Sequence, residues 1–330
     1  MHPQMKLLFI LDPLTSLKSY KDTSIAIMHE AAARGHTLYI CEQHDVFLQN
    51  EIVHIQASAF NFTHTENAEK NSAQTKNWFN LSVKYTALPN EFDAILMRKD
   101  PPFDNEYLYS TYLLELAVAQ GARVINNPSA VRGWNEKLST AKFPQFTPEF
   151  LVTANNDLIR EFLNKHQDII LKPLDGMGGT GIFRLTESDP NIGVVLETST
   201  LFGTKTVMVQ RYLPAILQGD KRIIVINGEP LPYALARIPK AGETRGNLAA
   251  GGTGVAQVLT ERDREIATTV GKTLKKEGLF LVGLDVIGDY LTEINVTSPT
   301  GMVEIAAQTK DLTIPCNPAK NFMQALETIH

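Results

Sequence analysis

The chain has 330 residues, of which 43% are hydrophobic and 20% charged, with a formal net charge of −5 and an isoelectric point near 5.9. This composition is typical of a globular protein and excludes the basic surface that non-specific nucleic-acid binding needs. No apolar run approaches the roughly 20 residues that span a bilayer, so neither a membrane nor a nucleic acid is expected as a partner. The length exceeds one ordinary hydrophobic core, and two or three domains are expected.

The two cysteines, Cys41 and Cys316, lie far apart and outside any Cys-x-x-Cys or Cys/His ligand spacing. Neither a disulfide framework nor a zinc site is therefore expected, and a reducing cytoplasm is the simplest setting. The apolar run 7–11 is too short for the core of a signal peptide and lacks a small-residue cleavage site. It predicts a first buried strand.

The first 126 residues alternate strand-like and helix-like patterns, which predicts an α/β layer with parallel strands. The polar stretch 57–77 is expected to be a surface excursion with little core of its own. We assign residues 1–126 to an N-terminal α/β domain. Its strands are predicted at 6–11, 38–41, 94–98 and 124–126, and its helices at 24–34 and 106–120, each ending at a glycine.

Antiparallel sheet dominates the pattern after Asn127, so the class is α/β overall and α+β in the C-terminal half. A unit at 127–205 is expected to hold strands 150–153, 168–172 and 182–185 and helices 157–166 and 190–198. A unit at 206–330 is expected to hold strand 207–212, a hairpin of 221–225 with 233–238, a helix 261–277 after the N-cap Thr260, and strands 279–287 and 291–296. The dipeptide Asn227-Gly228 predicts a type I′ turn in the hairpin.

A cation and four glycines follow the apolar run 168–171, in the segment Lys172-Pro173-Leu174-Asp175-Gly176-Met177-Gly178-Gly179-Thr180-Gly181. Glycines let backbone N–H groups approach phosphate oxygens, and the ammonium supplies a point charge. The segment is not a Walker A loop, because no Gly-Lys-Ser/Thr closes it, and not a Rossmann fingerprint, because a strand follows it. It predicts a phosphate-binding loop between two strands, with a mobile hairpin that binds nothing as the alternative.

Three hard oxygen donors, Asp285, Glu293 and Asn295, lie among apolar residues on the last two predicted strands. A buried carboxylate needs a cation, and Mg²⁺ prefers carboxylate oxygens together with nucleotide phosphates. A three-residue turn would oppose Asp285 to Glu293, whereas a two-residue turn would oppose it to Thr292; we expect the longer turn. The alternative is an edge hairpin whose acids are exposed or paired with Arg222 or Arg237.

A second glycine-rich segment, 242–254, carries Arg245 and Asn247. Its composition is typical of a loop that closes over a charged ligand, with a disordered linker as the alternative. Arg222 and Arg237 lie on the predicted hairpin and are expected to point toward the carboxylates or toward substrate oxygens.

The order of these motifs resembles the bacterial (prokaryotic-type) glutathione synthetases, a family of ATP-grasp ligases. The resemblance runs from Asp12 to Thr300, and its segment 97–104 is one that other ATP-grasp ligases do not share. Thr253 and Val303 depart from the family pattern, which has a cation or a polar residue at these positions. The resembling segments are 97–104, 135–137, 172–179, 210–214, 219–222, 243–252 and 291–299.

The resemblance implies an ATP-grasp fold with an N-terminal pre-ATP-grasp domain, a lid subdomain at 127–205 and a catalytic domain at 206–330. It implies Mg²⁺, with Mn²⁺ as the alternative ion, and ATP as co-substrate. The cysteinyl carboxylate of γ-glutamylcysteine would be phosphorylated and then attacked by the amine of glycine, giving glutathione, ADP and phosphate. A homotetramer is carried over from the family.

The resemblance also assigns roles to residues. Those expected to bind ATP are Lys137, Lys172, Asp175, Gly176, Gly178, Gly179, Gln210, Tyr212, Leu213 and Asp220. Those expected to bind the peptide substrate are Arg98, Arg222, Arg237, Asn295, Thr297 and Ser298, those expected to be catalytic are Arg222, Arg237, Arg245 and Asn247, and those expected to bind metal are Asp285, Glu293 and Asn295. Two alternatives stay open: an ATP-grasp ligase that joins other partners, and a nucleotide-binding regulator without turnover.

Overall fold

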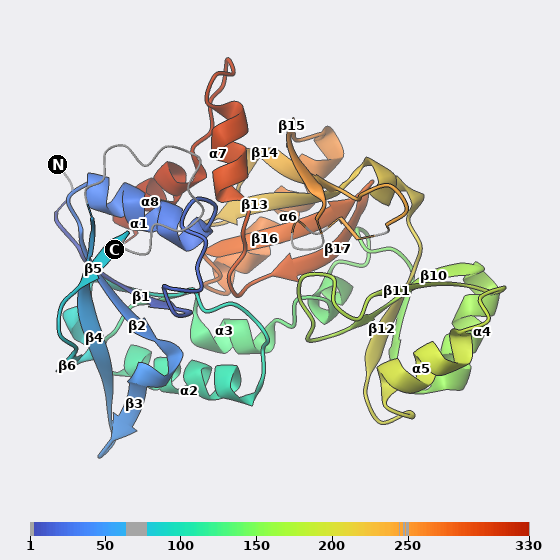
Figure 1. Cartoon of the computed structure of the whole chain (residues 1–330), viewed down its shortest axis with the longest axis horizontal. Helices are drawn as coiled ribbons and strands as arrows, with labels where there is room; N and C mark the ends of the chain where they lie inside the picture. The colour runs from blue at the N-terminus through green and yellow to red at the C-terminus, as the bar shows by residue number, and fades with distance from the viewer. Residues whose placement is uncertain (1–2, 64–77, 244, 247, 249–250, 330) are drawn as a thin grey trace.

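Three β-sheets organise the chain in this computed structural model, which describes residues 3–63, 78–243, 245–246, 248 and 251–329. Figure 1 shows the N-terminal sheet at one end, a small sheet at the other end and the C-terminal sheet between them. In the part of the chain that is described, no helix is both long enough and apolar enough to cross a membrane.

The N-terminal sheet has the order β3-β4-β2-β1-β7-β8, and β5 and β6 pair with β4. The predicted parallel layer is confirmed, because β1 is parallel to β2 and β7, and β7 to β8. Asp22 and Asp104 cap the helices α1 and α2 by accepting from backbone N–H groups. The elements are β1 (Lys6–Leu11), α1 (Thr23–Ala33), β2 (Thr37–Glu42), β3 (Val46–Gln49), β4 (Ile52–Phe62), β5 (Phe79–Leu81), β6 (Tyr85–Ala87), β7 (Ala94–Met97), α2 (Asn105–Ala119), β8 (Val124–Ile125) and α3 (Pro128–Gly133).

The prediction of a surface excursion at 57–77 is wrong for its first six residues. They complete the 11-residue strand β4, in which Ala57 and Phe60 are buried. Small and polar residues conceal this strand in the sequence, because Asn61 faces outward while its neighbour Phe60 packs inward. Residues 64–77 lie outside the described residues.

The small sheet has the order β11-β10-β12-β9, and all its neighbouring strands are antiparallel. Helices α4 and α5 pack against it, with Leu163 and Leu196 in their shared core. Residues 176–181, called here the glycine loop, join β10 to β11, so the strand–loop–strand prediction is confirmed. The elements are β9 (Phe150–Thr153), α4 (Asn156–His166), β10 (Asp168–Pro173), β11 (Phe183–Thr186), α5 (Ile192–Thr200) and β12 (Val207–Arg211), after the 3₁₀ helix η3 (Leu138–Lys142).

The C-terminal sheet is antiparallel with the order β15-β14-β13-β16-β17. Asn227 and Gly228 have φ values of 50° and 85°, which confirms the predicted turn type, and Thr260 caps α6 in a capping box with Asp263. The sequence predicts no element after residue 296, but two helices follow there. The elements are β13 (Asp220–Ile226), β14 (Glu229–Ile238), β15 (Thr253–Val258), α6 (Glu261–Lys276), β16 (Leu281–Ile287), β17 (Tyr290–Asn295), α7 (Met302–Thr309) and α8 (Pro318–Thr328).

Asn126 joins the N-terminal sheet to the C-terminal sheet. Its Nδ2 donates to the carbonyl oxygens of Leu281 (2.8 Å) and Val296 (2.9 Å), and its Oδ1 accepts from the N–H groups of Phe280 (2.7 Å) and Leu281 (2.8 Å). All four hydrogen-bonding positions of this buried amide are therefore used. Each of two hydrophobic clusters contains residues of both sheets, so the two sheets also pack together through apolar side chains.

Candidate active site

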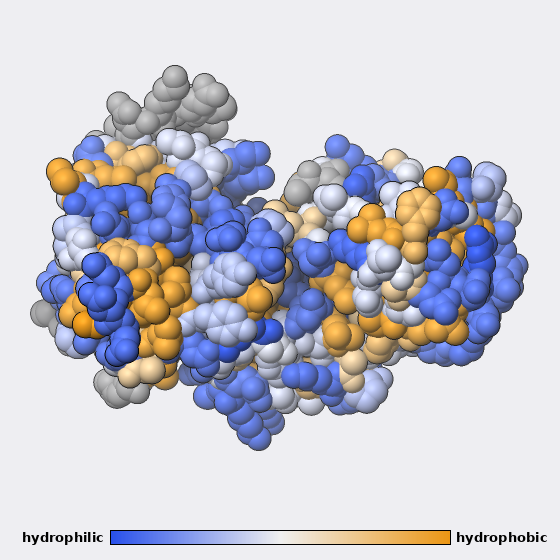
Figure 2. All heavy atoms as spheres, turned by 90° about the horizontal axis from the view of Figure 1, so that it is seen from below, coloured by the Kyte–Doolittle hydropathy of each residue, from blue (hydrophilic) through white to orange (hydrophobic). Residues whose placement is uncertain are grey.

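A cavity of about 460 Å³ lies between the small sheet and the C-terminal sheet and is lined in part by loops of the N-terminal sheet. Figure 2 shows the surface hollowed between the small-sheet part and the rest of the molecule. Segments that are far apart in sequence meet here. The predicted site residues that line the cavity are Lys137, Lys172, Gly176, Gly178, Gly179, Gln210, Tyr212, Leu213, Asp220, Arg222, Arg237, Arg245, Glu293, Asn295, Thr297 and Ser298.

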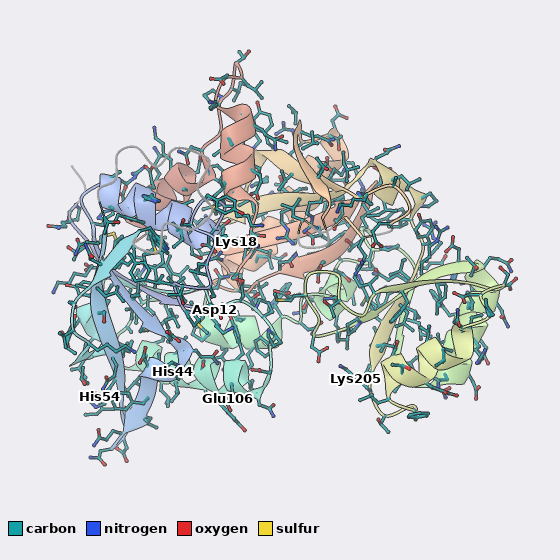
Figure 3. All side chains as sticks on the ribbon, in the orientation of Figure 1. Asp12, Lys18, His44, His54, Glu106 and Lys205 are labelled. Atoms are coloured by element: carbon teal, nitrogen blue, oxygen red, sulfur yellow. The ribbon has the colours of Figure 1, made fainter. Side chains whose placement is uncertain are left out.

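Three of the predicted residues lie elsewhere. Arg98 is buried behind the cavity, where its side chain donates to Ser24 Oγ (3.0 Å) and to the carbonyl oxygen of Pro299 (3.1 Å). Asp175 lines a neighbouring cavity of about 110 Å³ and pairs at 3.5 Å with Lys205, which Figure 3 labels on the small-sheet side. Asp285 lies behind two arginines. Asn247 lies outside the described residues.

Two ammonium groups and the glycine loop form one end of the cavity. Lys137 Nζ donates to the carbonyl oxygen of Gly176 (2.8 Å) and pairs with Glu293 (2.7 Å), while Lys172 Nζ donates to the carbonyl oxygen of Thr292 (3.2 Å). Burial lowers the pKa of Lys172 to about 8. Burial also lowers the pKa of Lys137, but the Glu293 carboxylate outweighs it and the net shift is upward. This end of the cavity is suited to phosphate groups.

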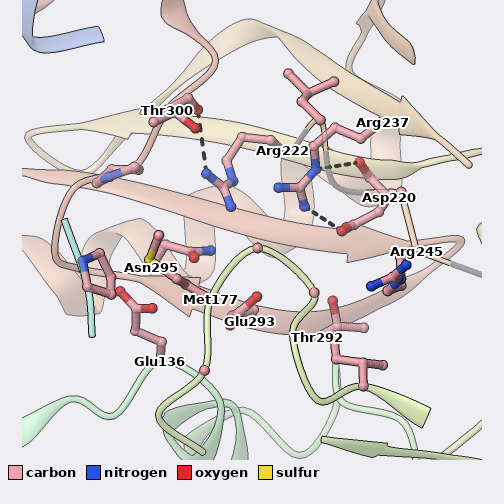
Figure 4. Close-up of a pocket in the computed structure, with 18 of the residues that line it drawn as sticks. Glu136, Met177, Asp220, Arg222, Arg237, Arg245, Thr292, Glu293, Asn295 and Thr300 are labelled. Atoms are coloured by element: carbon pink, nitrogen blue, oxygen red, sulfur yellow. Dashed lines mark hydrogen bonds and ion pairs between the residues drawn. The ribbon is translucent and has the colours of Figure 1, made fainter. Parts of the chain in front are cut away.

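The glycine loop needs its glycines at three positions. Gly178, Gly179 and Gly181 have φ values of 65°, 84° and 73°, which lie in the left-handed region that side chains with a Cβ rarely adopt. Met177 lies within the loop, and in Figure 4 its side chain extends toward Asn295. The loop lies close to the final hairpin, because the Lys137 ammonium group contacts both the carbonyl oxygen of Gly176 and Glu293.

Asp285 lies between two guanidinium groups on the C-terminal sheet. Its Oδ1 accepts from Arg222 Nε (2.5 Å), and its Oδ2 accepts from Arg222 Nη2 (3.0 Å) and pairs with Arg237 Nη2 (2.8 Å). Burial raises the pKa of Asp285, but the two guanidinium groups outweigh burial and hold that pKa well below its usual range. Arg237 also pairs with Asp220, whose pKa burial raises to about 6 (Figure 4).

In the final hairpin, the predicted pairing of Asp285 with Glu293 is present, but the turn differs from the prediction. Asp285 is opposite Glu293, as expected, but the turn has two residues, because Ile287 pairs with Tyr290 and Val286 with Leu291. A bulge places Thr292 between the two paired stretches, and its hydroxyl donates to the carbonyl oxygen of Asp285 (3.1 Å). The prediction of a longer turn is wrong. The bulge supplies the register shift instead.

Two of the three predicted metal ligands keep oxygens that fit Mg²⁺. The Oε1 atom of Glu293 pairs with the Lys137 ammonium group. Asn295 donates through Nδ2 to the carbonyl oxygen of Gly283 (3.0 Å), which leaves its Oδ1 as an acceptor. Both residues line the cavity, and the donor set of carboxylate and amide oxygens suits a hard cation. Asp285 is engaged by guanidinium groups through both oxygens. Within the described residues, no cluster of three His, Cys, Asp or Glu side chains could hold an ion unaided.

An apolar slot forms another part of the cavity around Gln210, Tyr212 and Leu213. Gln210 is buried, and its Nε2 has no hydrogen-bond partner in the described part of the chain. Arg184 stacks over the Tyr212 ring, 3.7 Å from its centroid. An apolar part of the cavity with one unsatisfied amide donor is suited to a heteroaromatic base.

Thr297 and Ser298 line the cavity beside acidic residues that the sequence did not single out. Thr297 Oγ1 donates to Glu136 Oε1 (2.9 Å), and Ser298 Oγ hydrogen-bonds to Asp100. Burial raises the pKa of Glu136. Glu136 stands between the motif residues Asn135 and Lys137, and this adjacency is a signal that could have identified it. Other lining residues that were missed are Lys18, Lys21, Asp22, Thr292 and Glu304.

Both halves of the chain match the same family. Residues 5–132 match the family described as "Prokaryotic glutathione synthetase, N-terminal domain", and residues 136–310 match "Prokaryotic glutathione synthetase, ATP-grasp domain". The chain belongs to the prokaryotic glutathione synthetase family. The resemblance seen in the motifs is thereby confirmed.

Curated glutathione synthetases are similar to this chain over nearly their whole length. The protein of Nitrosomonas europaea is 57% identical over 305 residues, which cover 92% of this chain and 93% of that protein. The protein of Neisseria meningitidis serogroup A is 55% identical over 92% of this chain and 94% of its own length. That of Ralstonia nicotianae is 51% identical over 98% and 95%.

Solved structures share the fold at low sequence identity. A D-cycloserine synthetase aligns with a TM-score of 0.63 and 14% identity over 98% of both chains. D-alanyl-alanine synthetase A from Vibrio cholerae aligns with a TM-score of 0.58 and 16% identity over 98% of this chain and 97% of its own. The expected ATP-grasp fold of the α/β class is confirmed. This member of the glutathione synthetase family is therefore an ATP-dependent carbon–nitrogen ligase.

Proposed function

We propose that the chain joins γ-glutamylcysteine and glycine to form glutathione, with ATP converted to ADP and phosphate. The observation that carries this proposal is one cavity that has two lysines and a glycine loop at one end and Arg222 and Arg237 on the facing sheet. The name that the Nitrosomonas and Neisseria proteins carry, at 57% and 55% identity, supports these substrates.

The proposed chemistry uses no protein nucleophile. The γ-phosphoryl group of ATP passes to the cysteinyl carboxylate, which breaks the bond to ADP and gives an acyl phosphate. The neutral amine of glycine then attacks the acyl carbon, and phosphate and a proton leave as the amide forms. Lys137 and Lys172 would hold the phosphates. Arg222, whose Nη1 has only a 3.5 Å contact to the carbonyl oxygen of Thr300, would bind the reacting carboxylate together with Arg237.

Glu293 and Asn295 would hold Mg²⁺, or Mn²⁺ in its place. When bound, the ion offsets phosphate charge during transfer. Asp285 is the third proposed ligand, and it would reach a metal only after its two guanidinium partners move toward substrate. The remaining ATP contacts are proposed to be Asp175, Gly176, Gly178, Gly179, Gln210, Tyr212, Leu213 and Asp220. The remaining peptide contacts are proposed to be Arg98, Thr297 and Ser298.

Residues 242–254 are proposed to close over the acyl phosphate and exclude water. Arg245 lines the cavity and pairs with Glu243 at 2.7 Å, which supports a position near the substrates. Asn247 is proposed to act with it. The proposed units are 1–126, 127–205 and 206–330, and we extend the proposal to a cytoplasmic homotetramer on the family resemblance alone.

The decisive experiment measures ADP release and glutathione formation with Mg²⁺, ATP, γ-glutamylcysteine and glycine, omitting each in turn. Release that needs all four components, with one glutathione for each ADP, is expected. Release that persists without glycine would indicate a different acceptor or hydrolysis of the acyl phosphate. No release with all four present would contradict the proposal and favour a regulator that binds ATP without turnover.

A further inference from the structure

Residues 135–137, called here the linking segment, are held on the C-terminal sheet. The N–H group of Ile294 in strand β17 donates to the carbonyl oxygen of Glu136 (2.8 Å). The Glu136 carboxylate accepts from the N–H group of Val296 (3.1 Å) and from the hydroxyl group of Thr297 (2.9 Å). The linking segment therefore has a fixed position relative to the end of β17.

Two side chains of the linking segment reach the start of the glycine loop. Asn135 Nδ2 donates to the carbonyl oxygen of Leu174 (3.1 Å). Lys137 Nζ donates to the carbonyl oxygen of Gly176 (2.8 Å). The two donors are two residues apart, and so are the two acceptors. Together the two hydrogen bonds join the start of the glycine loop to a segment that is fixed on the C-terminal sheet.

The same Asn135 side chain also fixes the backbone of Lys137. Its Oδ1 accepts from the N–H groups of Lys137 (3.2 Å) and Leu138 (2.9 Å). Asparagine commonly stabilises a turn in this way, by accepting from backbone N–H groups two and three residues further along the chain. One carboxamide group thus sets the position of a lysine of the phosphate end and the position of the loop beside it.

The two links to the loop should respond differently to a nucleotide. Phosphate oxygens are charged, so they compete with the neutral carbonyl oxygen of Gly176 for the Lys137 ammonium group. Asn135 lines the neighbouring cavity of about 110 Å³ and not the main cavity, so its hydrogen bond to Leu174 can persist when Lys137 turns to phosphate. The chain between Leu174 and the loop is tightly folded, since a Cβ atom on Gly176 would lie 2.7 Å from Pro173 Cγ. A shift of Leu174 would therefore move the loop.

We propose that Asn135 is a positioning residue that holds the glycine loop in place while Lys137 binds the phosphate groups of ATP. The inference rests on the proposed nucleotide site. Asn135 acts through Leu174 and Lys137 and makes no contact with the nucleotide itself. Its loss should weaken binding of the phosphate groups and leave binding of the base unchanged, because the apolar part of the cavity around Gln210 lies on strand β12 and the residues that follow it.

The test measures nucleotide binding by wild type and Asn135→Ser. Serine still accepts from the backbone N–H groups that follow it but is too short to reach Leu174. The affinity for the non-hydrolysable ATP analogue AMP-PNP with Mg²⁺, measured by calorimetry, should fall about three- to tenfold, the change expected when one neutral hydrogen bond is lost. The affinity for adenosine, measured by competition, should not change.

Asn155→Ser is the matched control. Asn155 is also exposed, and its Oδ1 accepts from the N–H groups two and three residues further along, at 2.8 and 3.3 Å, as the N-cap of α4. This variant should bind both ligands as wild type does. Unchanged AMP-PNP affinity in Asn135→Ser would overturn the proposal, and so would an equal loss for adenosine or an equal loss in the control.

A second variant separates the hydrogen bond to Leu174 from the turn. Asn135→Asp keeps the side-chain length and the accepting oxygen, but replaces the donor to Leu174 with an oxygen. It should also bind AMP-PNP more weakly than wild type. A loss in Asn135→Asp combined with wild-type affinity in Asn135→Ser would reflect only the added charge and would contradict the proposal.

Steady-state kinetics gives a readout that a general structural role would not produce. In Asn135→Ser the KM for ATP should rise while the KM values for γ-glutamylcysteine and glycine stay unchanged. A similar rise in all three KM values would indicate a general loss of structure and contradict the proposal. Failure of the proposed function is distinguishable, because wild type would then form no glutathione, whereas AMP-PNP binding needs no turnover and still decides the role of Asn135.

Discussion

Asp285 and Arg222 face each other across strands β16 and β13, and both carboxylate oxygens of Asp285 accept from the Arg222 guanidinium at 2.5 and 3.0 Å. Arg237 reaches the same carboxylate from strand β14. Three buried charged side chains on adjacent strands thus form one ion-pair group beneath the cavity. The group holds both arginines on Asp285, from which they would move toward substrate in the proposed reaction.

Asp285→Asn is expected to lower the free energy of unfolding by about 3–5 kcal/mol, because two buried guanidinium groups lose their shared counter-ion. Urea unfolding measures the change. Asp168→Asn is the control, since its pair with Arg184 is partly exposed and should contribute less than about 1 kcal/mol. Similar losses in the two variants would contradict a buried ion-pair group.

Glu293→Gln is expected to reduce turnover at least about 100-fold, because it removes a carboxylate from the proposed metal site. The free energy of unfolding should change by less than about 2 kcal/mol, since the amide oxygen still accepts from Lys137. Turnover measured across a range of Mg²⁺ concentrations tests this. Near-normal turnover would remove Glu293 from the metal site.

Arg245→Ala is expected to release more ADP than the glutathione it forms, because a less complete closure of residues 242–254 admits water to the acyl phosphate. Parallel assays of ADP and glutathione give the ratio, which should be one in wild type. Arg160→Ala, an exposed change on α4, is the control. An unaltered ratio in Arg245→Ala would mean that this segment is only a linker.

Lys172 should make stability depend on pH in alkaline solution. Its pKa of about 8 in the folded protein lies below the usual value of about 10.4. Between about pH 8 and about pH 10.4, this lysine therefore binds more protons in the unfolded chain than in the folded protein. The contribution of Lys172 to the free energy of unfolding therefore rises as the pH increases from about 8 to about 10.4. Urea unfolding at pH 8 and pH 10 should show a smaller rise in Lys172→Met than in wild type. Lys205→Met, a change at a partly exposed lysine, should behave as wild type. Equal rises in all three proteins would argue against a strongly lowered pKa of Lys172.

Asn126→Asp is expected to lower the free energy of unfolding by about 3 kcal/mol or more. The change replaces an amide donor with an oxygen that faces the carbonyl oxygens of Leu281 and Val296. Chemical denaturation of the variant and of the exposed control Asn80→Asp measures the difference. A loss below about 1 kcal/mol would mean that the two sheets do not depend on this amide.

Several features of the fold could be predicted from the sequence because they depend on neighbouring residues alone. The Asn227-Gly228 turn, the Thr260 cap and the glycine loop depend on residues within a few positions, and each was predicted correctly. The second half of strand β4 was wrongly predicted to be a surface segment, because it contains polar residues. Its burial depends on pairing with β2, which the local sequence does not indicate. Helix α7 was not predicted at all, and its position depends on packing against β14 and β15.

The sequence by itself determined the family, the alternation of elements and a set of site residues most of which line the cavity, because motif order and turn chemistry are local properties. Only the tertiary structure decided which charges meet. Asp285 could face a metal or an arginine until the β13–β16 register placed Arg222 opposite it, and the Thr292 bulge set its pairing with Glu293. Cross-strand register and burial arise from long-range packing, which residue spacing along the chain does not encode.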